Sequence, residues 1–156
     1  MKITILGCGN SLGVPVIGCD CAVCTSNNPK NKRLRVSVFI EINGINLLID
    51  TSPDFRQQML LNNIRKIDAV LYTHDHADHA HGLDDLRQFN ALQGDAIAIY
   101  SNDEIIASLQ KRFAYAFLPK PASDSLFRPS LVPHIFPDAD IHEFKIGKVS
   151  VIAFKQ

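Results

Sequence analysis

The order of apolar and polar positions along the chain predicts alternating strands and helices. Short apolar or alternating runs predict strands at residues 2–6, 36–42, 45–49, 69–72, 96–100, 141–145 and 149–154. Asn43-Gly44 stands between the second and third runs and predicts a type I′ hairpin turn. Helical spacing predicts helices over residues 54–62, 82–89 and 103–114.

Within two of these helices the apolar positions also predict which side faces the core. The first helix would turn Phe55, Met59 and Leu60 inward, and the second carries Leu83, Leu86 and Phe89 on one stripe. Residues 118–137 interrupt the rhythm with five prolines, which predicts a long excursion over the surface or across the site. Helices alternating around a sheet place the chain in the α/β (α+β) class.

Length and composition favour one globular unit and exclude several partners. The 156 residues, 46% of them hydrophobic, suffice for one domain over residues 1–156 with one core. Sixteen basic residues balance sixteen acidic ones, so the chain lacks the net positive field that general nucleic-acid binding uses. No apolar run reaches the length of a membrane span and no secretory signal is present, so we expect a cytoplasmic protein without a membrane partner.

The segment after the run at 69–72 is the richest in chemistry. His74, His76, Asp78 and His79 follow that run within six residues. Histidine and aspartate suit divalent ions such as Zn²⁺ or Mn²⁺. A helix would scatter these side chains around its circumference, so we expect a tight ligand loop, followed by a helix beginning near Ala80 whose N-terminal end favours anions.

Three of the four cysteines are candidates for a second metal site. Cys19, Cys21 and Cys24 have a spacing that can grip one structural zinc ion, and the alternative is three reduced, exposed thiols. This spacing is more natural for a thiolate cluster than for disulfides, which again favours the cytosol. Cys8 falls outside the spacing and is expected to be a small core residue.

Several other residues carry two interpretations each. The glycine-rich residues 7–13 lack the third glycine of a dinucleotide fingerprint, so we interpret them as a close approach of backbone to other groups. Arg33 and Arg35 belong to a solvated basic loop or contact a substrate phosphate. Asp50, at the end of a buried strand, orients a metal-bound histidine from behind or caps the next helix.

The motif His74-x-His76-x-Asp78-His79 after an apolar strand resembles the signature of the metallo-β-lactamase superfamily. The glycine-rich residues 7–15, the cysteine triplet, and residues 48–54 and 82–87 narrow the resemblance to the branch that contains the cyclic phosphodiesterase of phosphonate breakdown. The resemblance implies an αββα sandwich and a metal-dependent phosphodiesterase acting on small cyclic or nucleotide-like phosphodiesters. It covers most of residues 1–100.

The resemblance also implies a role for each matching residue. His74 and His76 would hold a first divalent ion, Zn or Mn, and Asp78 and His79 a second. Asp78 would in addition act catalytically by orienting the bridging hydroxide. The cysteine triplet would hold the branch's structural zinc, and His81 would lie at the pocket edge or behind the ligands.

The remaining ligands of the superfamily have no match in this sequence. Beyond His81 the chain has only His134 and His142, and neither stands in the setting the family uses, so we expect both to be surface or core residues. We therefore expect these residues to be the N-terminal half or more of a longer hydrolase, which pairs with its C-terminal half or with a second copy. A transfer-RNA 3′-processing nuclease and an inactive metal-binding or partner-binding fragment are the alternatives.

Overall fold

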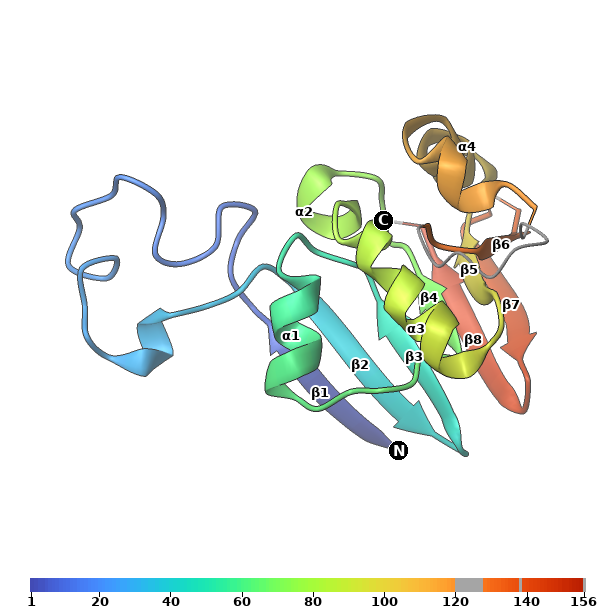
Figure 1. The fold of residues 1–156 in the computed structure, drawn as a ribbon, viewed down its shortest axis with the longest axis horizontal. Coiled ribbons are helices and arrows are strands. Elements are labelled where there is room, and N and C mark those ends of the chain that lie inside the picture. Colours follow the sequence, from blue (N-terminus) through green and yellow to red (C-terminus); the bar gives the residue numbers. More distant parts are fainter. Residues whose placement is uncertain (120–127, 138, 156) are drawn as a thin grey trace.

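A computed structural model describes residues 1–119, 128–137 and 139–155, and it consists of two sheets with helices on one side (Figure 1). The larger sheet has the order β1-β2-β3-β4-β5-β6 and the smaller one pairs β7 with β8. The strands are β1 Lys2–Gly7, β2 Ser37–Ile42, β3 Ile45–Ile49, β4 Ala69–Leu71, β5 Ile97–Ser101, β6 Leu131–Ile135, β7 Ile141–Ile146 and β8 Val149–Phe154. The helices are α1 Phe55–Leu61, α2 Ala77–Ala80, α3 Leu86–Gln93 and α4 Asp103–Arg112, with short 3-10 turns η1 Pro29–Asn31, η2 Leu83–Asp85 and η3 Ala114–Phe117.

The larger sheet is buried on both faces because its central strands alternate between two cores. Leu48 and Val70 belong to the core beneath α1, α3 and α4. Leu47 and Ala69, their neighbours in sequence, face the β7–β8 hairpin instead. This period of two explains the nearly continuous apolar runs. The predicted α/β class with a sheet flanked by helices is confirmed.

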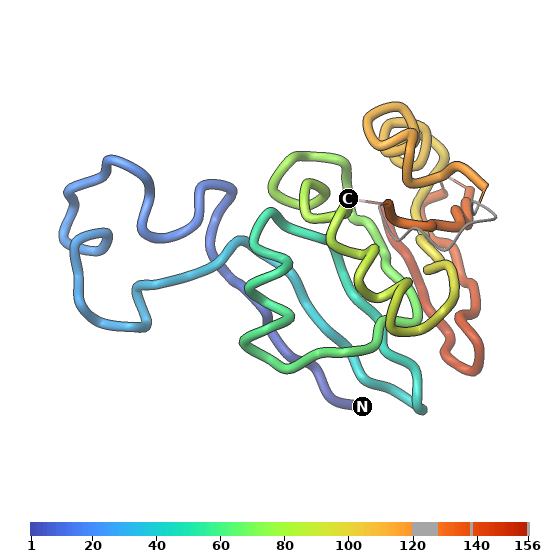
Figure 2. Tube along the Cα trace, in the orientation of Figure 1, coloured from blue at the N-terminus to red at the C-terminus, as the bar shows by residue number. Residues whose placement is uncertain are grey.

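The strand directions decide where the site lies. β1, β2 and β3 are antiparallel, whereas β3, β4, β5 and β6 run parallel to one another. The carboxyl ends of β3 and β4 therefore meet at one sheet edge, where ligand-binding loops of such sheets gather. Residues 8–36 leave this body as a long extension, drawn in blue in Figure 2.

Local predictions from residue pattern are confirmed at several points. Asn43 and Gly44 both have positive φ, 52° and 79°, as the type I′ turn requires. Leu83, Leu86 and Phe89 are buried on one stripe. Gly7 lies so close to the backbone of Arg35 that a Cβ atom would collide with it, which is the close approach expected of the glycine-rich loop.

Two predicted core residues are at the surface. Leu60 is 64% exposed, and Gln58 takes the buried position because its amide donates to the Arg35 carbonyl oxygen at 2.8 Å. Cys8 is exposed rather than in the core, because it lies where the chain leaves β1 for the extension.

Two element predictions were wrong. The helix expected near Ala80 begins at Ala77 and is only one turn long, so Asp78 and His79 lie on α2 and the expected anion-favouring helix end is not formed there. The excursion over residues 118–137 ends in strand β6, where Pro133 is tolerated because β6 is the edge of the sheet. Residues 120–127 of that excursion lie outside the described part. No helix in the described ranges has the length and apolar character to cross a membrane.

Candidate metal centre

The carboxyl ends of β3 and β4 hold the histidine-rich segment in place. The backbone N–H of Thr51, just after β3, donates to the carbonyl oxygen of His79 at 2.7 Å, and the N–H of Gly82 donates to Thr51 at 2.9 Å. These bonds dock α2 onto the end of the sheet. Gly82 has no room for a side chain, because a Cβ atom there would collide with the Ser52 backbone.

The four predicted ligands come together at this edge. Donor atoms of His74, His76 and Asp78 lie within 4.8 Å of one another. His79 adjoins them, with its Nε2 atom 3.3 Å from Asp78 Oδ2 and its ring centroid 3.8 Å from that of His74. His74 and His76 come from the loop after β4, and Asp78 and His79 come from α2.

Asp50 stands behind the histidines and is 3% exposed. Its Oδ1 accepts the Thr73 backbone N–H at 2.8 Å, and its Oδ2 lies 2.7 Å from both the Thr73 hydroxyl and His79 Nδ1. Its backbone is left-handed, with φ of 59°, a conformation that aspartate and asparagine tolerate. Between the two interpretations offered by the sequence, this geometry matches the one in which Asp50 orients a histidine.

This network fixes which nitrogen of each histidine carries the proton. A carboxylate only accepts hydrogen bonds, so both the Thr73 hydroxyl and His79 Nδ1–H donate to Asp50. The single hydroxyl proton of Thr73 is then used, and its oxygen, 3.0 Å from His74 Nδ1, must accept from that nitrogen. His74 and His79 therefore both keep a lone pair on Nε2, the nitrogen a metal would bind.

Burial lowers the pKa of His74 below its ordinary value, and the neighbouring His79 adds to this effect. The neutral imidazole is the form that binds metal, so the shift retains that form to lower pH than in a free histidine. The residues therefore fit a divalent ion in donor type, tautomer and charge.

The other candidate residues lie around the cluster. His81 is exposed and its ring forms a T-shaped contact with that of Phe113, with centroids 5.8 Å apart. Arg35 makes a two-pronged ion pair with Asp54 through Nε at 2.9 Å and Nη2 at 2.6 Å. Arg33 is exposed in the extension, where its Nε donates to the Lys30 carbonyl oxygen.

The ion pair between Arg35 and Asp54 has two consequences. It holds the pKa of Asp54 below its ordinary value, mainly through the hydrogen bond from Arg35. It also occupies the Asp54 carboxylate, so α1 has no side-chain cap. Sequence reasoning assigned no role to Asp54 in positioning Arg35, because the two residues are 19 positions apart.

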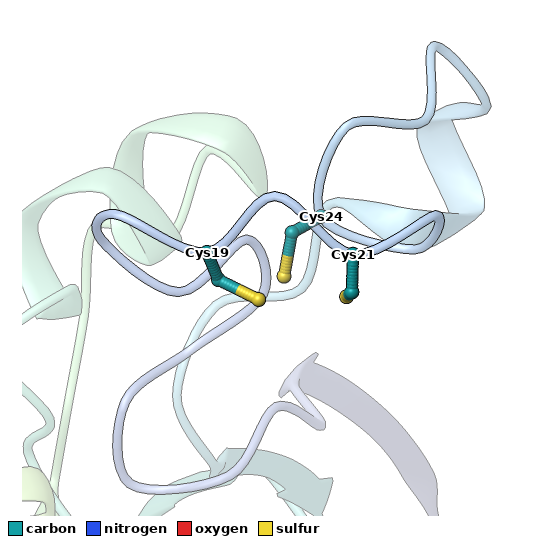
Figure 3. Close-up of side chains that lie close together, drawn as sticks. All are labelled: Cys19, Cys21 and Cys24. Carbon is teal, nitrogen blue, oxygen red and sulfur yellow. The ribbon is translucent and has the colours of Figure 1, made fainter.

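The cysteine triplet forms a second donor cluster on the extension. The sulfur atoms of Cys19, Cys21 and Cys24 lie within 4.8 Å of one another, and Figure 3 shows the three side chains projecting to the same side of the loop. The Val16 backbone N–H donates to Cys24 Sγ at 3.4 Å. The backbone N–H of Cys24 lowers the pKa of the Cys21 thiol to about 7, which favours the thiolate that binds zinc.

Sequence reasoning missed two residues at the site, Thr73 and Asp75. Thr73 links Asp50 to His74, whereas Asp75 turns away from the ligands to Ser108 and Arg112. The hydroxyl directly after an apolar strand was the available signal for Thr73. Nothing local marks the partners of Asp75, which lie 33 and 37 positions further along the chain.

The fold and the site together define an α/β protein with a candidate metal centre, a histidine–aspartate cluster, at the edge of its parallel strands. Residues 45–156 match the family model described as the beta-lactamase superfamily domain. The chain therefore belongs to the beta-lactamase superfamily and has the metallo-β-lactamase fold.

Three known proteins are similar to this chain in sequence or in fold. A solved diphosphatase of the PhnP family is 39% identical with a TM-score of 0.81, over 95% of this chain and 54% of that one. The octanoyltransferase of Porphyromonas gingivalis is 44% identical over 78% of this chain and 24% of its own. Zinc-bound PqqB from Methylobacterium extorquens shares the fold, with 24% identity and a TM-score of 0.70 over 91% of this chain and 48% of that one. The chain thus spans about half of the two solved relatives and a quarter of the transferase.

Proposed function

We propose that this chain carries the metal-binding part of a phosphodiesterase acting on small cyclic or nucleotide-like phosphodiesters. The observation that supports it most is the shared orientation of His74 and His79, whose Nδ1 atoms are both held by the Asp50–Thr73 network. A carboxylate or hydroxyl that holds the second ring nitrogen is typical of metal-ligating histidines. The PhnP-family relative, described as a diphosphatase, supports phosphorus chemistry over lactam or thioester hydrolysis.

In this proposal each residue has a distinct task. His74 and His76 hold one divalent ion, Zn or Mn, and Asp78 and His79 hold a second. Two such ions supply a water of lowered pKa and positive charge for the phosphate oxygens. Asp78 also orients the attacking water, and Asp50 keeps the proton of His79 on Nδ1, away from the ion. Cys19, Cys21 and Cys24 hold a structural zinc ion in a cytosolic setting.

The nuclease alternative receives no support from charge. The chain has a formal net charge of zero, whereas a protein that grips a nucleic-acid backbone uses many unpaired basic residues. Arg35, the most enclosed basic residue of the extension, is already committed to Asp54. We therefore favour a small substrate.

The proposal can be tested with the purified chain and added Mn²⁺ or Zn²⁺. The assay measures hydrolysis of bis(p-nitrophenyl) phosphate and of 2′,3′-cyclic nucleotides. We expect turnover that falls at least about 100-fold in His76→Ala, since loss of a ligand opens the ion's coordination shell. His142→Ala is the matched control, because His142 stacks on Phe144 of the same hairpin and belongs to neither donor cluster. Metal binding without turnover would favour the inactive-fragment alternative, and adding the remaining half of a longer relative would then restore activity.

A further inference from the structure

The loop that supplies two of the four ligands has little backbone support. In the described parts of the chain, no backbone–backbone hydrogen bond uses the N–H of residues 74, 75 or 76. Before the loop, Asp50 holds the N–H of Thr73, and after it the His76 carbonyl accepts from His79 and Ala80. The loop between these anchors needs another fixed point if its histidines are to keep one geometry.

Helix α4 provides that point through Asp75. The Ser108 hydroxyl donates to Asp75 Oδ2 at 2.5 Å. Arg112 Nη1 donates to the Asp75 backbone carbonyl at 2.5 Å and lies 3.3 Å from Oδ2. Ser108 and Arg112 are four positions apart, so they lie on the same face of the helix. From that face they hydrogen-bond both the carboxylate and the backbone carbonyl of Asp75.

The helix that makes this grip is itself firmly held. Ile106 and Leu109 are fully buried on its sheet-facing side, and the Asn102 side chain caps its first turn by accepting from the Ile105 N–H at 2.9 Å. Beyond its end, Phe113 touches His81 and the Tyr115 hydroxyl donates to Asp84 at 3.0 Å. The segment from α4 into η3 therefore contacts the ligand segment at Asp75 and the residues that follow it at His81 and Asp84.

We propose that Ser108 and Arg112 are positioning residues that act through Asp75 to hold His74 and His76 ready for a metal ion. The inference rests on the proposed function, since it needs the ion to bind at this cluster. The competing explanation is a partly exposed ion pair that only stabilises the fold; the side chains of Arg112 and Asp75 are 33% and 35% exposed. The two explanations differ in what happens to metal affinity when the fold is intact.

A titration of the full chain with Mn²⁺ distinguishes the two explanations. Binding is monitored through the loss of the electron paramagnetic resonance signal of the free ion. Mn²⁺ prefers nitrogen and oxygen ligands, so it reports the histidine–aspartate cluster rather than the cysteine cluster. The variants are Ser108→Ala, Arg112→Met and Arg112→Lys, each checked for a wild-type melting temperature. Lys111→Met is the matched control, because it removes a positive charge from the neighbouring exposed position.

We expect Ser108→Ala and Arg112→Met each to raise the Kd for Mn²⁺ about tenfold, the lower end of the range for partners of ligating side chains. Arg112→Lys should recover part of the loss, and Lys111→Met should stay within about twofold. Ser108→Ala combined with Asp75→Ala should bind no more weakly than Asp75→Ala alone, since Ser108 acts through that carboxylate.

Wild-type affinity in folded Ser108→Ala and Arg112→Met would overturn the inference and leave the proposed function intact. Additive losses in the double variant would also overturn it, because the two side chains would then act separately. A wild-type chain that binds neither Mn²⁺ nor Zn²⁺ at this cluster would overturn the proposed function, and the inference with it.

Discussion

Replacing Asp50 with asparagine should invert the proton positions of two histidines without disturbing the backbone. Asparagine tolerates the left-handed conformation of this position. Its oxygen must accept the Thr73 N–H, so its NH₂ group takes the place of Oδ2 and faces the Thr73 hydroxyl and His79 Nδ1. Since NH₂ can only donate, His79 must move its proton to Nε2. The Thr73 hydroxyl then donates to His74 Nδ1, and His74 also places its proton on Nε2.

The size of the effect follows from what metal binding would now require. Returning His79 to its ligand tautomer leaves its part-buried Nδ1–H facing the asparagine NH₂ group, at a cost of about 1–3 kcal/mol. Returning His74 costs less, about 0.5–1.5 kcal/mol, because the exposed Thr73 hydroxyl only loses its bond to Nδ1 and turns its proton away. The lower end of the sum, about 1.5 kcal/mol, is about a tenfold loss of affinity. Partners behind metal ligands usually contribute about 10- to 100-fold, so we expect the Kd for Mn²⁺ to rise about 10- to 100-fold.

Two measurements on the same samples check this reasoning. Long-range ¹H–¹⁵N NMR reads the tautomer of each histidine, and Mn²⁺ titration reads the affinity. Asp68→Asn is the matched control, because Asp68 lies at the opposite end of β4, where it accepts from the Asn46 N–H at 2.8 Å and pairs with Lys66. Nδ1–H tautomers and wild-type affinity in Asp50→Asn would refute the argument.

Three further outcomes are expected. Asp54→Asn should lower the free energy of unfolding by about 1.5–3 kcal/mol at neutral pH, because it breaks the charged bonds to Arg35. The pKa of Asp54 is depressed in the folded state, so this contribution is fully present above the unfolded value of about 3.9 and is lost progressively as pH falls from there through the lower folded-state value. Urea titrations should therefore show a smaller difference between the variant and the wild type at pH 3 than at pH 7. Gly82→Ala should cost about 1–3 kcal/mol in the same titrations through its collision with Ser52, and an unchanged midpoint would contradict the packing described. Alkylation of Cys21 by iodoacetamide should accelerate as pH rises through about 7 and stop when Zn²⁺ is added; alkylation that Zn²⁺ does not slow would exclude the cysteine site.

The sequence was most informative where a structure depends on neighbouring residues. The turn at Asn43-Gly44 follows from the positive φ that these residue types accept. The stripe of Leu83, Leu86 and Phe89 follows from helical spacing. The ligand segment was recognisable for the same reason, since its four candidate ligands fall within six residues after one strand.

The misjudged elements share a different cause. Leu60 and Gln58 are two positions apart and so lie on nearly opposite sides of α1, and Gln58 is the buried one because its side chain bonds the carbonyl oxygen of Arg35. Pro133 is one of the five prolines that predicted an excursion instead of a strand. It is tolerated in β6 because the sheet order places β6 at the edge, where a missing N–H is not needed for pairing. Neither the carbonyl nor the sheet order can be deduced from spacing along the helix or strand itself.

The sequence by itself determined the chemistry of this protein, which is a set of imidazole, carboxylate and thiolate donors suited to divalent ions. Only the tertiary structure decided how those donors are held. Asp50 meets His79 across 29 positions, and Asp75 meets Arg112 across 37. Dihedral preferences and periodicity act over a few residues, whereas contacts of this separation exist only after β3, β4 and α4 have packed around a common core.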